Sequence, residues 1–210
     1  MHGKWNFILC GIGYSTDLQD GPVGFFTPGV DLHSMDLKDI PDTTKWQIAS
    51  RLASRLPVMY DFIFRERIGA QYDELEQDIW IEIGKQSKEV AGALRLPLKT
   101  APQVAEALRI ISTIFFSADY TVEHLKIAED RSVLRITRCP FIFREIEIRG
   151  STGPVFSRCL TFAITSVEAL NPEYTLRFVR SMCMGDKACE MKVVKKELVA
   201  DEEQVPGTEK

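Results

Sequence analysis

Apolar residues recur at helical spacing through most of the first half of the chain. The stretches 42–56, 58–68, 72–94 and 102–117 return an apolar residue every three to four positions, so they predict helices. Pro57 is expected to end the first of these helices, because proline removes a backbone donor and clashes with the preceding turn. The expected buried stripe of the third helix consists of Tyr72, Leu75, Ile79, Ile83, Val90 and Leu94.

The pattern changes from helical spacing to strand-like alternation at about residue 120. Two alternating runs, 120–127 and 132–139, flank the tight turn Glu129-Asp130-Arg131 and predict a β-hairpin. Pro140 is expected to end or bend the second strand, since it has no N–H for the ladder. The run 141–148 alternates as well, and we expect it to continue the edge of the sheet.

A helix and a second hairpin follow. Pro154 marks the first turn of a helix that runs to about residue 170, and the runs 174–182 and 189–195 then alternate around a turn at Gly185-Asp186. The order hairpin, helix, hairpin predicts an α+β fold of two layers. In it an antiparallel sheet is covered by the N-terminal helices.

The domain organisation is read from the loop-forming composition at both ends. We expect a single α+β domain over residues 42–196 and an acidic, disordered tail over 197–210. Residues 1–41 are rich in Gly, Pro and Asp and predict a loop-rich arm. That arm either packs over the core or forms a lid that brings His33 or Asp36 to a site.

Composition narrows the class of protein. The chain has 210 residues, 45% hydrophobic and 27% charged, which is ordinary for a soluble globular protein. A formal net charge of -4 without a basic cluster argues against nucleic-acid and membrane binding. We find no apolar run long enough to span a membrane and no signal peptide. Five cysteines, an odd number, favour free or metal-bound thiols in the cytoplasm.

Four of the cysteines are predicted to meet. If the second strand runs down to Cys139, the next helix starts at that end with Cys159, and the following hairpin returns there with Cys183 and Cys189. Four thiolates at one point would form a tetrahedral structural zinc site, and we expect these four residues to be the ligands. His33 or His124 could add one ligand.

Two alternatives to zinc remain open at the cysteines. They could be small buried core residues, which free cysteines often are. They could also include a catalytic or redox thiol. Cys139 is then the best nucleophile, because Arg138 or a nearby helix N-terminus could lower its pKa.

The segment from Arg158-Cys159 through Asn171-Pro172 to Gly185-Asp186-Lys-Ala-Cys189 resembles a known superfamily, the 4-vinyl reductase or hydrocarbon-binding domains. Ile79-Trp-Ile-Glu-Ile-Gly84 and the hairpin ending at Cys139-Pro140 fit the L-2-amino-thiazoline-4-carboxylic acid hydrolase-like branch better. The resemblance covers about residues 70–195. It implies a pocket for small aromatic or apolar molecules, with zinc held by cysteines around the Gly-Asp turn. In the hydrolase-like branch it implies opening of a cyclic thiazoline by water.

These observations leave three hypotheses for function. The first is a small-molecule-binding sensor or accessory protein. Its pocket lies between the helix at 103–117, the helix at 154–170 and the sheet, and its ligand is aromatic or a carboxylic acid. The second is a ring-opening hydrolase that uses Cys139 or a metal-bound water. The third is a structural subunit of a larger complex, and a homodimer or a partner protein is possible. The candidate pocket residues are Phe115, Phe116, Phe156, Phe162, Arg177 and Arg180.

Overall fold

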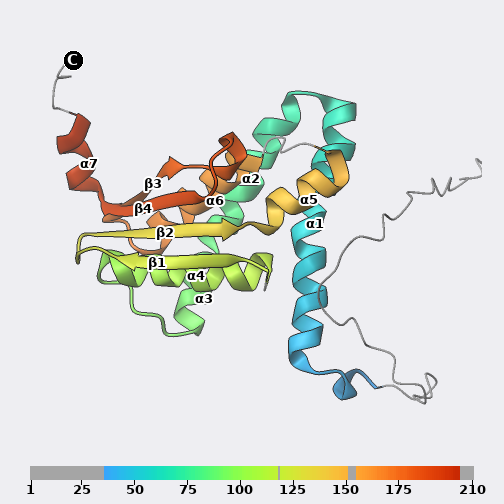
Figure 1. Cartoon of the computed structure of the whole chain (residues 1–210), viewed down its shortest axis with the longest axis horizontal. Coiled ribbons are helices and arrows are strands. Elements are labelled where there is room, and N and C mark those ends of the chain that lie inside the picture. The colour runs from blue at the N-terminus through green and yellow to red at the C-terminus, as the bar shows by residue number, and fades with distance from the viewer. Residues whose placement is uncertain (1–35, 118, 151–154, 204–210) are drawn as a thin grey trace, which may run out of the picture. The chain divides into compact units, whose positions relative to one another are not determined.

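The chain divides into two units, Met1–Asp39 and Ile40–Lys210. The structure is a computed structural model that describes residues 36–117, 119–150 and 155–203 (Figure 1). In the first unit the described part contains a short 3-10 helix, η1 (Leu37–Asp39), and Asp36 is paired there with Lys38. His33 and most of the predicted arm lie outside the described residues.

The second unit alternates helices and strands as the sequence pattern changes. Its elements in chain order are α1 (Asp42–Ile68), α2 (Gln71–Lys85), α3 (Ser87–Ala93), α4 (Ala101–Phe116), β1 (Thr121–Lys126), β2 (Arg131–Arg138), α5 (Pro140–Arg149), α6 (Val155–Leu170), β3 (Tyr174–Arg180), η2 (Met182–Met184), β4 (Cys189–Lys195) and α7 (Lys196–Glu203). None of the described helices is both long enough and apolar enough to cross a membrane.

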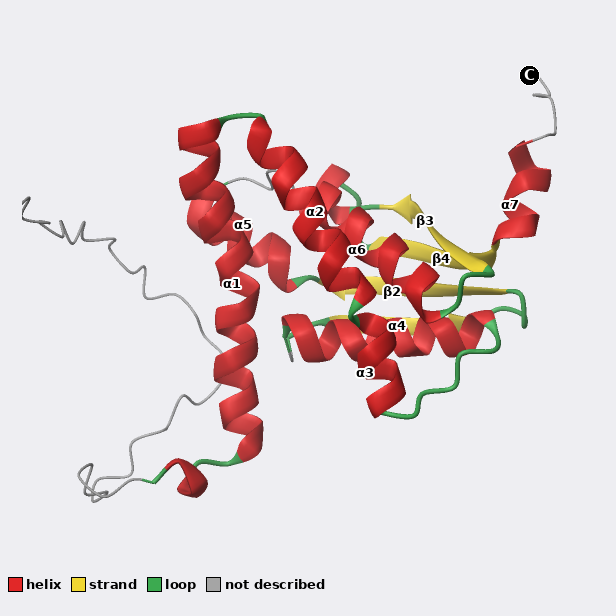
Figure 2. Ribbon diagram, turned by 180° about the vertical axis from the view of Figure 1, so that it is seen from behind, coloured by secondary structure: helices red, strands yellow, loops and turns green. Residues whose placement is uncertain are grey.

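Within the described residues, four strands form one antiparallel sheet in the order β1-β2-β4-β3. Both predicted hairpins are therefore present, and they join through β2 and β4, where Leu134 pairs with Met191. Helices α4 and α6 pack against one face of the sheet, and α2 packs on α6 (Figure 2). The α+β fold predicted from the sequence is confirmed.

The core lies between the sheet and these helices. Apolar residues of α4, among them Val104, Leu108 and Ile111, are fully buried at helical spacing. Inward residues of β2 and β4 meet them because side chains on a strand alternate between its two faces. At the end of α4 the core becomes aromatic. Rings pack there at centroid distances of 4.7–6.2 Å between Trp80, Phe116, Phe141 and Phe162.

The predicted end of the first helix at Pro57 is wrong. Helix α1 continues through this proline to Ile68. A proline inside a helix removes one backbone hydrogen bond, but packing on either side can hold the flanking turns. Ser54 and Val58 are both fully buried against the domain, so both turns are held in place.

The predicted third helix is two helices, α2 and α3, and its expected stripe is partly wrong. Leu75 and Ile79 are exposed, whereas Glu76 and Gly84 are buried. Glu76 is turned inward to pair with a buried arginine of α6. A Cβ added at Gly84 would lie 2.8 Å from the Thr165 Cβ, so this glycine allows α2 to approach α6 closely.

The run 141–148 is a helix and not the predicted edge strand. Cys139 is the extended N-cap residue of α5, and Pro140 occupies the first turn, where a missing N–H costs nothing. Gly150 closes the helix in the left-handed conformation at φ 72°. Phe141, Ile142 and Glu145 are buried, which is a helical spacing that the strand-like alternation concealed.

The predicted disordered tail is also wrong over its first part. Residues Lys196–Glu203 form helix α7, which follows β4 directly. Lys196 N–H donates a hydrogen bond to the carbonyl of Glu173, which ties the start of α7 to the beginning of β3. Residues 204–210 lie outside the described part of the chain.

Candidate functional site

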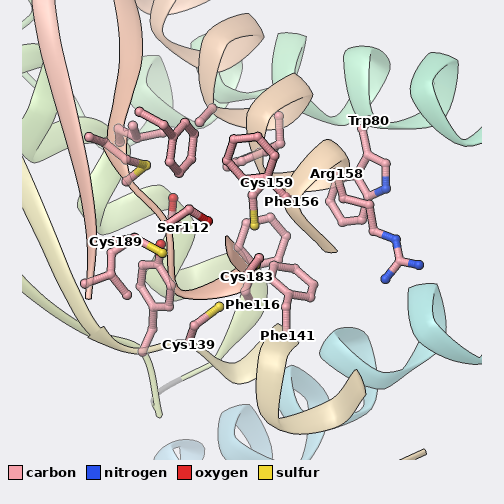
Figure 3. Close-up of a pocket in the computed structure, with 18 residues that line it drawn as sticks. Trp80, Ser112, Phe116, Cys139, Phe141, Phe156, Arg158, Cys159, Cys183 and Cys189 are labelled. Carbon is pink, nitrogen blue, oxygen red and sulfur yellow. The ribbon is translucent and has the colours of Figure 1, made fainter. Parts of the chain in front are cut away.

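The candidate site is a cavity enclosed by α4, α6 and the sheet, with α2 and α5 contributing one wall (Figure 3). The space open to the centre of a water molecule is about 30 Å³. That is more than the roughly 10–15 Å³ that one water needs. Its aromatic walls consist of Trp80, Phe116, Tyr120, Phe141, Phe156, Phe162 and Phe178.

The predicted pocket residues divide into those that line this cavity and those that do not. Phe116, Phe156 and Phe162 line it, and Phe115 packs behind them, its ring 6.0 Å from that of Phe116. Arg177 and Arg180 are not among the lining residues. Arg180 is exposed and lies 3.6 Å from Glu190.

Several lining residues were missed from the sequence. Trp80 lay in the predicted third helix but outside its expected stripe, and Phe141 lay in the supposed edge strand. Ser112, Ser181 and Met191 gave no chemical signal, because single polar or apolar residues on periodic elements are usually structural. The spacing of Ser112 from Leu108 and Phe116, four residues on either side, would have placed it on the same helix face.

The four cysteines predicted to converge all line the cavity, and all four are free thiols. Cys139 directly follows β2, Cys159 lies in the second turn of α6, Cys183 is in η2 and Cys189 begins β4. The tracing of strands and helix from the sequence therefore placed them correctly. Figure 3 shows the labelled cysteines arranged around the same hollow.

The thiol of Cys139 differs from the other three in its electrostatics. A hydrogen bond from the Cys159 thiol lowers the pKa of Cys139, and the backbone N–H groups of Ile142 and Phe141 at the start of α5 add to this effect. The same contact raises the pKa of Cys159 well above its usual value, together with burial. Cys139 is therefore the better thiolate of this pair, and the start of α5 is the nearby helix N-terminus that was expected to lower its pKa.

Burial has the largest effect on the pKa values of the remaining two thiols, Cys183 and Cys189. It raises the pKa of Cys183 to about 12, and it raises the pKa of Cys189 as well. The Met182 N–H donates to the Cys189 sulfur at 3.2 Å, and the Ser181 N–H donates to Asp186 at 2.9 Å. Asp186 therefore closes the turn between η2 and β4, in agreement with its reading as a turn residue.

The donor set has the soft sulfur chemistry that zinc accepts. However, the described residues contain no group of three His, Cys, Asp or Glu side chains placed to hold a metal ion. His124 lies elsewhere, and His33 is outside the described residues. Zinc at these cysteines stays a prediction from the sequence.

Beside the cavity lies a buried charge network, in which one member also lines the cavity. The network consists of Asp61, Glu76, Glu145, Arg65, Arg149 and Arg158. Arg158 of α6 is 2% exposed and lies 3.1 Å from Asp61 of α1. It also lies 2.5 Å from Glu76 of α2 and 3.0 Å from Glu145 of α5. A single guanidinium thus connects four helices.

A second buried polar group has the composition of a hydrolase triad. His124 lies 2.9 Å from Glu106 through Nδ1 and 2.8 Å from the Ser132 hydroxyl through Nε2. The Ser132 hydroxyl donates to the Leu125 carbonyl, and Ser132 is fully buried within β2. A nucleophile must reach its substrate, so this arrangement serves to fix β1 and β2 to α4.

Comparison with known proteins supports the fold. No protein-family model matches the chain, and no curated protein matches it in sequence. Among solved structures it is similar to the crystal structure of the phenol-responsive sensory domain of the transcription activator PoxR with phenol. The TM-score is 0.50 at 13% identity, over 75% of this chain and 82% of that domain. At that identity the likeness shows a shared α+β fold, and the superfamily named from the motifs stays a prediction.

Proposed function

We propose that the protein binds a small, largely apolar aromatic molecule in the cavity and acts as a sensory or accessory domain. The observation that carries this proposal is the enclosure of the cavity by aromatic rings from α2, α4, α5 and α6. Ligand sites are typically concave and apolar, with a few polar groups that fix orientation. Trp80 and Phe162 pack edge to face on each other, and aromatic rings that line a cavity favour a planar aromatic ligand, which can make the same kind of contact.

The polar groups on the cavity wall suit a ligand with one hydroxyl. Ser112, Tyr120 and Ser181, which carry hydroxyl groups, are among the lining residues. Burial raises the pKa of Tyr120 well above its usual value, so its phenol stays protonated and can donate a hydrogen bond. The phenol carried by the structurally similar sensory domain has this combination of one ring and one hydroxyl, which supports a phenol-like ligand here.

The hydrolase alternative finds less support from the geometry. Among the described residues that line the cavity there is no histidine and no carboxylate to act as a general base. The lowered pKa of Cys139 favours a nucleophilic thiolate, but it supplies no proton acceptor for an attacking water. We therefore retain ligand binding as the function.

Isothermal titration with phenol, with 3-methylphenol and with cyclohexanol as a non-aromatic control tests the proposal. Ala163 lines the cavity and is buried, so Ala163→Phe should fill it and abolish binding of both phenols. Ala163→Ser adds one atom and should retain binding. Over-packing costs about 1–3 kcal/mol, so thermal melts confirm that both variants are folded. Equal affinity of wild type and Ala163→Phe for the phenols would refute the site.

A further inference from the structure

Helix α1 carries its apolar side chains on the outside. The stripe that it buries against its own domain consists of Ser50, Ser54, Val58 and Asp61, of which only one is apolar. Surface helices normally turn their apolar stripe toward the core. In α1 the small and polar stripe faces the core, so the apolar stripe faces away from the domain.

The outward stripe is continuous along the helix. Ile48, Leu52, Met59 and Ile63 are 64%, 57%, 42% and 41% exposed, and the half-buried Leu56 lies between them. Successive members are three or four residues apart, so they share one face of the helix. Figures 1 and 2 show α1 along one side of the domain. Soluble proteins rarely expose a contiguous apolar surface of this kind without a binding role.

The order of residues in the stripe is self-complementary when the helix is reversed. If two copies of α1 run antiparallel with a two-fold axis between residues 55 and 56, Ile48 faces Ile63 and Leu52 faces Met59. The same register brings Lys45 opposite Glu66. The four exposed apolar residues then meet apolar residues, Leu56 lies beside the axis opposite Arg55, and each end of the pair gains an opposite-charge contact. A parallel pair in register would place Lys45 opposite Lys45 and Glu66 opposite Glu66.

The arginines beside the stripe do not oppose this pairing. Arg51 lies 3.7 Å from Asp119, and Arg55 lies 3.7 Å from Glu147, so carboxylates of the same chain compensate both cations. Arg55 is next to the axis, where two uncompensated copies would repel each other. The domain has therefore removed the like-charge contact that would otherwise lie at the centre of the pair.

We propose that α1 is a dimerisation helix, which packs antiparallel on α1 of a second copy of this chain. Such an interface is isologous, because the same patch is used by both subunits. A helix of 27 residues is about 40 Å long, which offers a seam of several turns on each side of the axis. Stable protein interfaces need roughly 800 Å² from each partner, and flanking residues can contribute to that area.

Sedimentation equilibrium of the full chain, up to about 100 µM, tests the proposal. The wild type should have twice the 23.8 kDa mass of one chain. Leu52→Glu should be monomeric, because it places an acid against Met59 of the second copy. Leu75→Glu is the matched control, since Leu75 of α2 is 53% exposed but lies outside the stripe, and it should remain a dimer.

A charge exchange tests the antiparallel register itself. Lys45→Glu and Glu66→Lys should each weaken the dimer about tenfold, because two contacts change from attraction to repulsion. The double variant should recover the wild-type affinity. Positions 45 and 66 are roughly 31 Å apart on one helix, so recovery requires a second chain.

Three results would overturn the proposal. These are a monomeric wild type, a dimer that Leu52→Glu leaves intact, and a double variant as weak as the single ones. A monomeric wild type is also the result expected if residues 1–35 of the same chain cover the stripe.

Discussion

Replacing Arg158 by methionine should destabilise the protein strongly. The guanidinium is 2% exposed and is shared by three carboxylates, of which Asp61 and Glu145 have no exposed surface. Removing one partner of a buried ion pair costs about 3–5 kcal/mol, because the remaining charges stay buried without compensation. In a unit of this size that corresponds to a melting temperature lower by roughly 10 °C. Methionine keeps most of the apolar volume, so little of the loss comes from packing.

The loss should depend on pH in a defined direction. Burial raises the pKa of Glu76 above its usual value, and Arg158 opposes this rise. A carboxyl whose folded-state pKa is raised binds more protons in the folded state. Its contribution to stability therefore falls as the pH rises from its unfolded-state pKa to its folded-state pKa. Without Arg158 the folded-state pKa of Glu76 rises further, so the pH range over which stability falls extends upward. The destabilisation by Arg158→Met should therefore be larger at about pH 7.5 than at about pH 5.

Chemical denaturation at both pH values measures these differences. Arg135→Met is the matched control, because Arg135 is exposed and lies 3.5 Å from the exposed Glu123. Exposed pairs contribute about 0–1 kcal/mol, so this variant should be close to wild type. A loss below about 1 kcal/mol for Arg158→Met, or an equal loss at both pH values, would show that the network is not a buried set of ionised groups.

Two further predictions concern helix packing and the cysteines. Gly84→Val should lower the free energy of unfolding by about 1–3 kcal/mol, because its side chain meets Thr165. Gly92→Ala, which meets no atom within 4 Å, should raise that free energy by about 0.5–1 kcal/mol in the same denaturation assay. The zinc hypothesis predicts about one zinc per purified chain by elemental analysis, lost in Cys139→Ser and in Cys189→Ser. Metal-free wild-type protein would contradict that hypothesis.

The two hairpins and the helix between them were predictable because their signals are local. Turn residues at Asp130 and Gly185 separate alternating runs, and Asn171-Pro172 ends a helix, so hairpin, helix and hairpin follow from short-range chemistry. Once these elements are in order, the antiparallel connections bring their ends together. The convergence of the four cysteines was predictable for that reason.

Other features depended on contacts between distant residues. Glu76 and Arg158 are 82 positions apart and look like surface residues in the sequence, yet each is buried because the other is present. Helix α5 was missed because it starts directly after β2. Pro140, which signals the end of a strand, also occupies the first turn of this helix. Ring contacts around Trp80 join α2, α4, α5 and α6, and no local pattern specifies such a cluster.

The position of β4 in the sheet has a consequence for biosynthesis. It is the last strand of the described residues, but it lies between β2 and β3, so neither hairpin joins the other until residues 189–195 have been made. Until then the apolar faces of α4 and α6 have no complete sheet to cover. Such surfaces make unfinished chains prone to aggregation, and translation at about 5–20 residues per second sets how long they persist. The apolar faces of α4 and α6 in a nascent chain are therefore open to aggregation until β4 emerges from the ribosome.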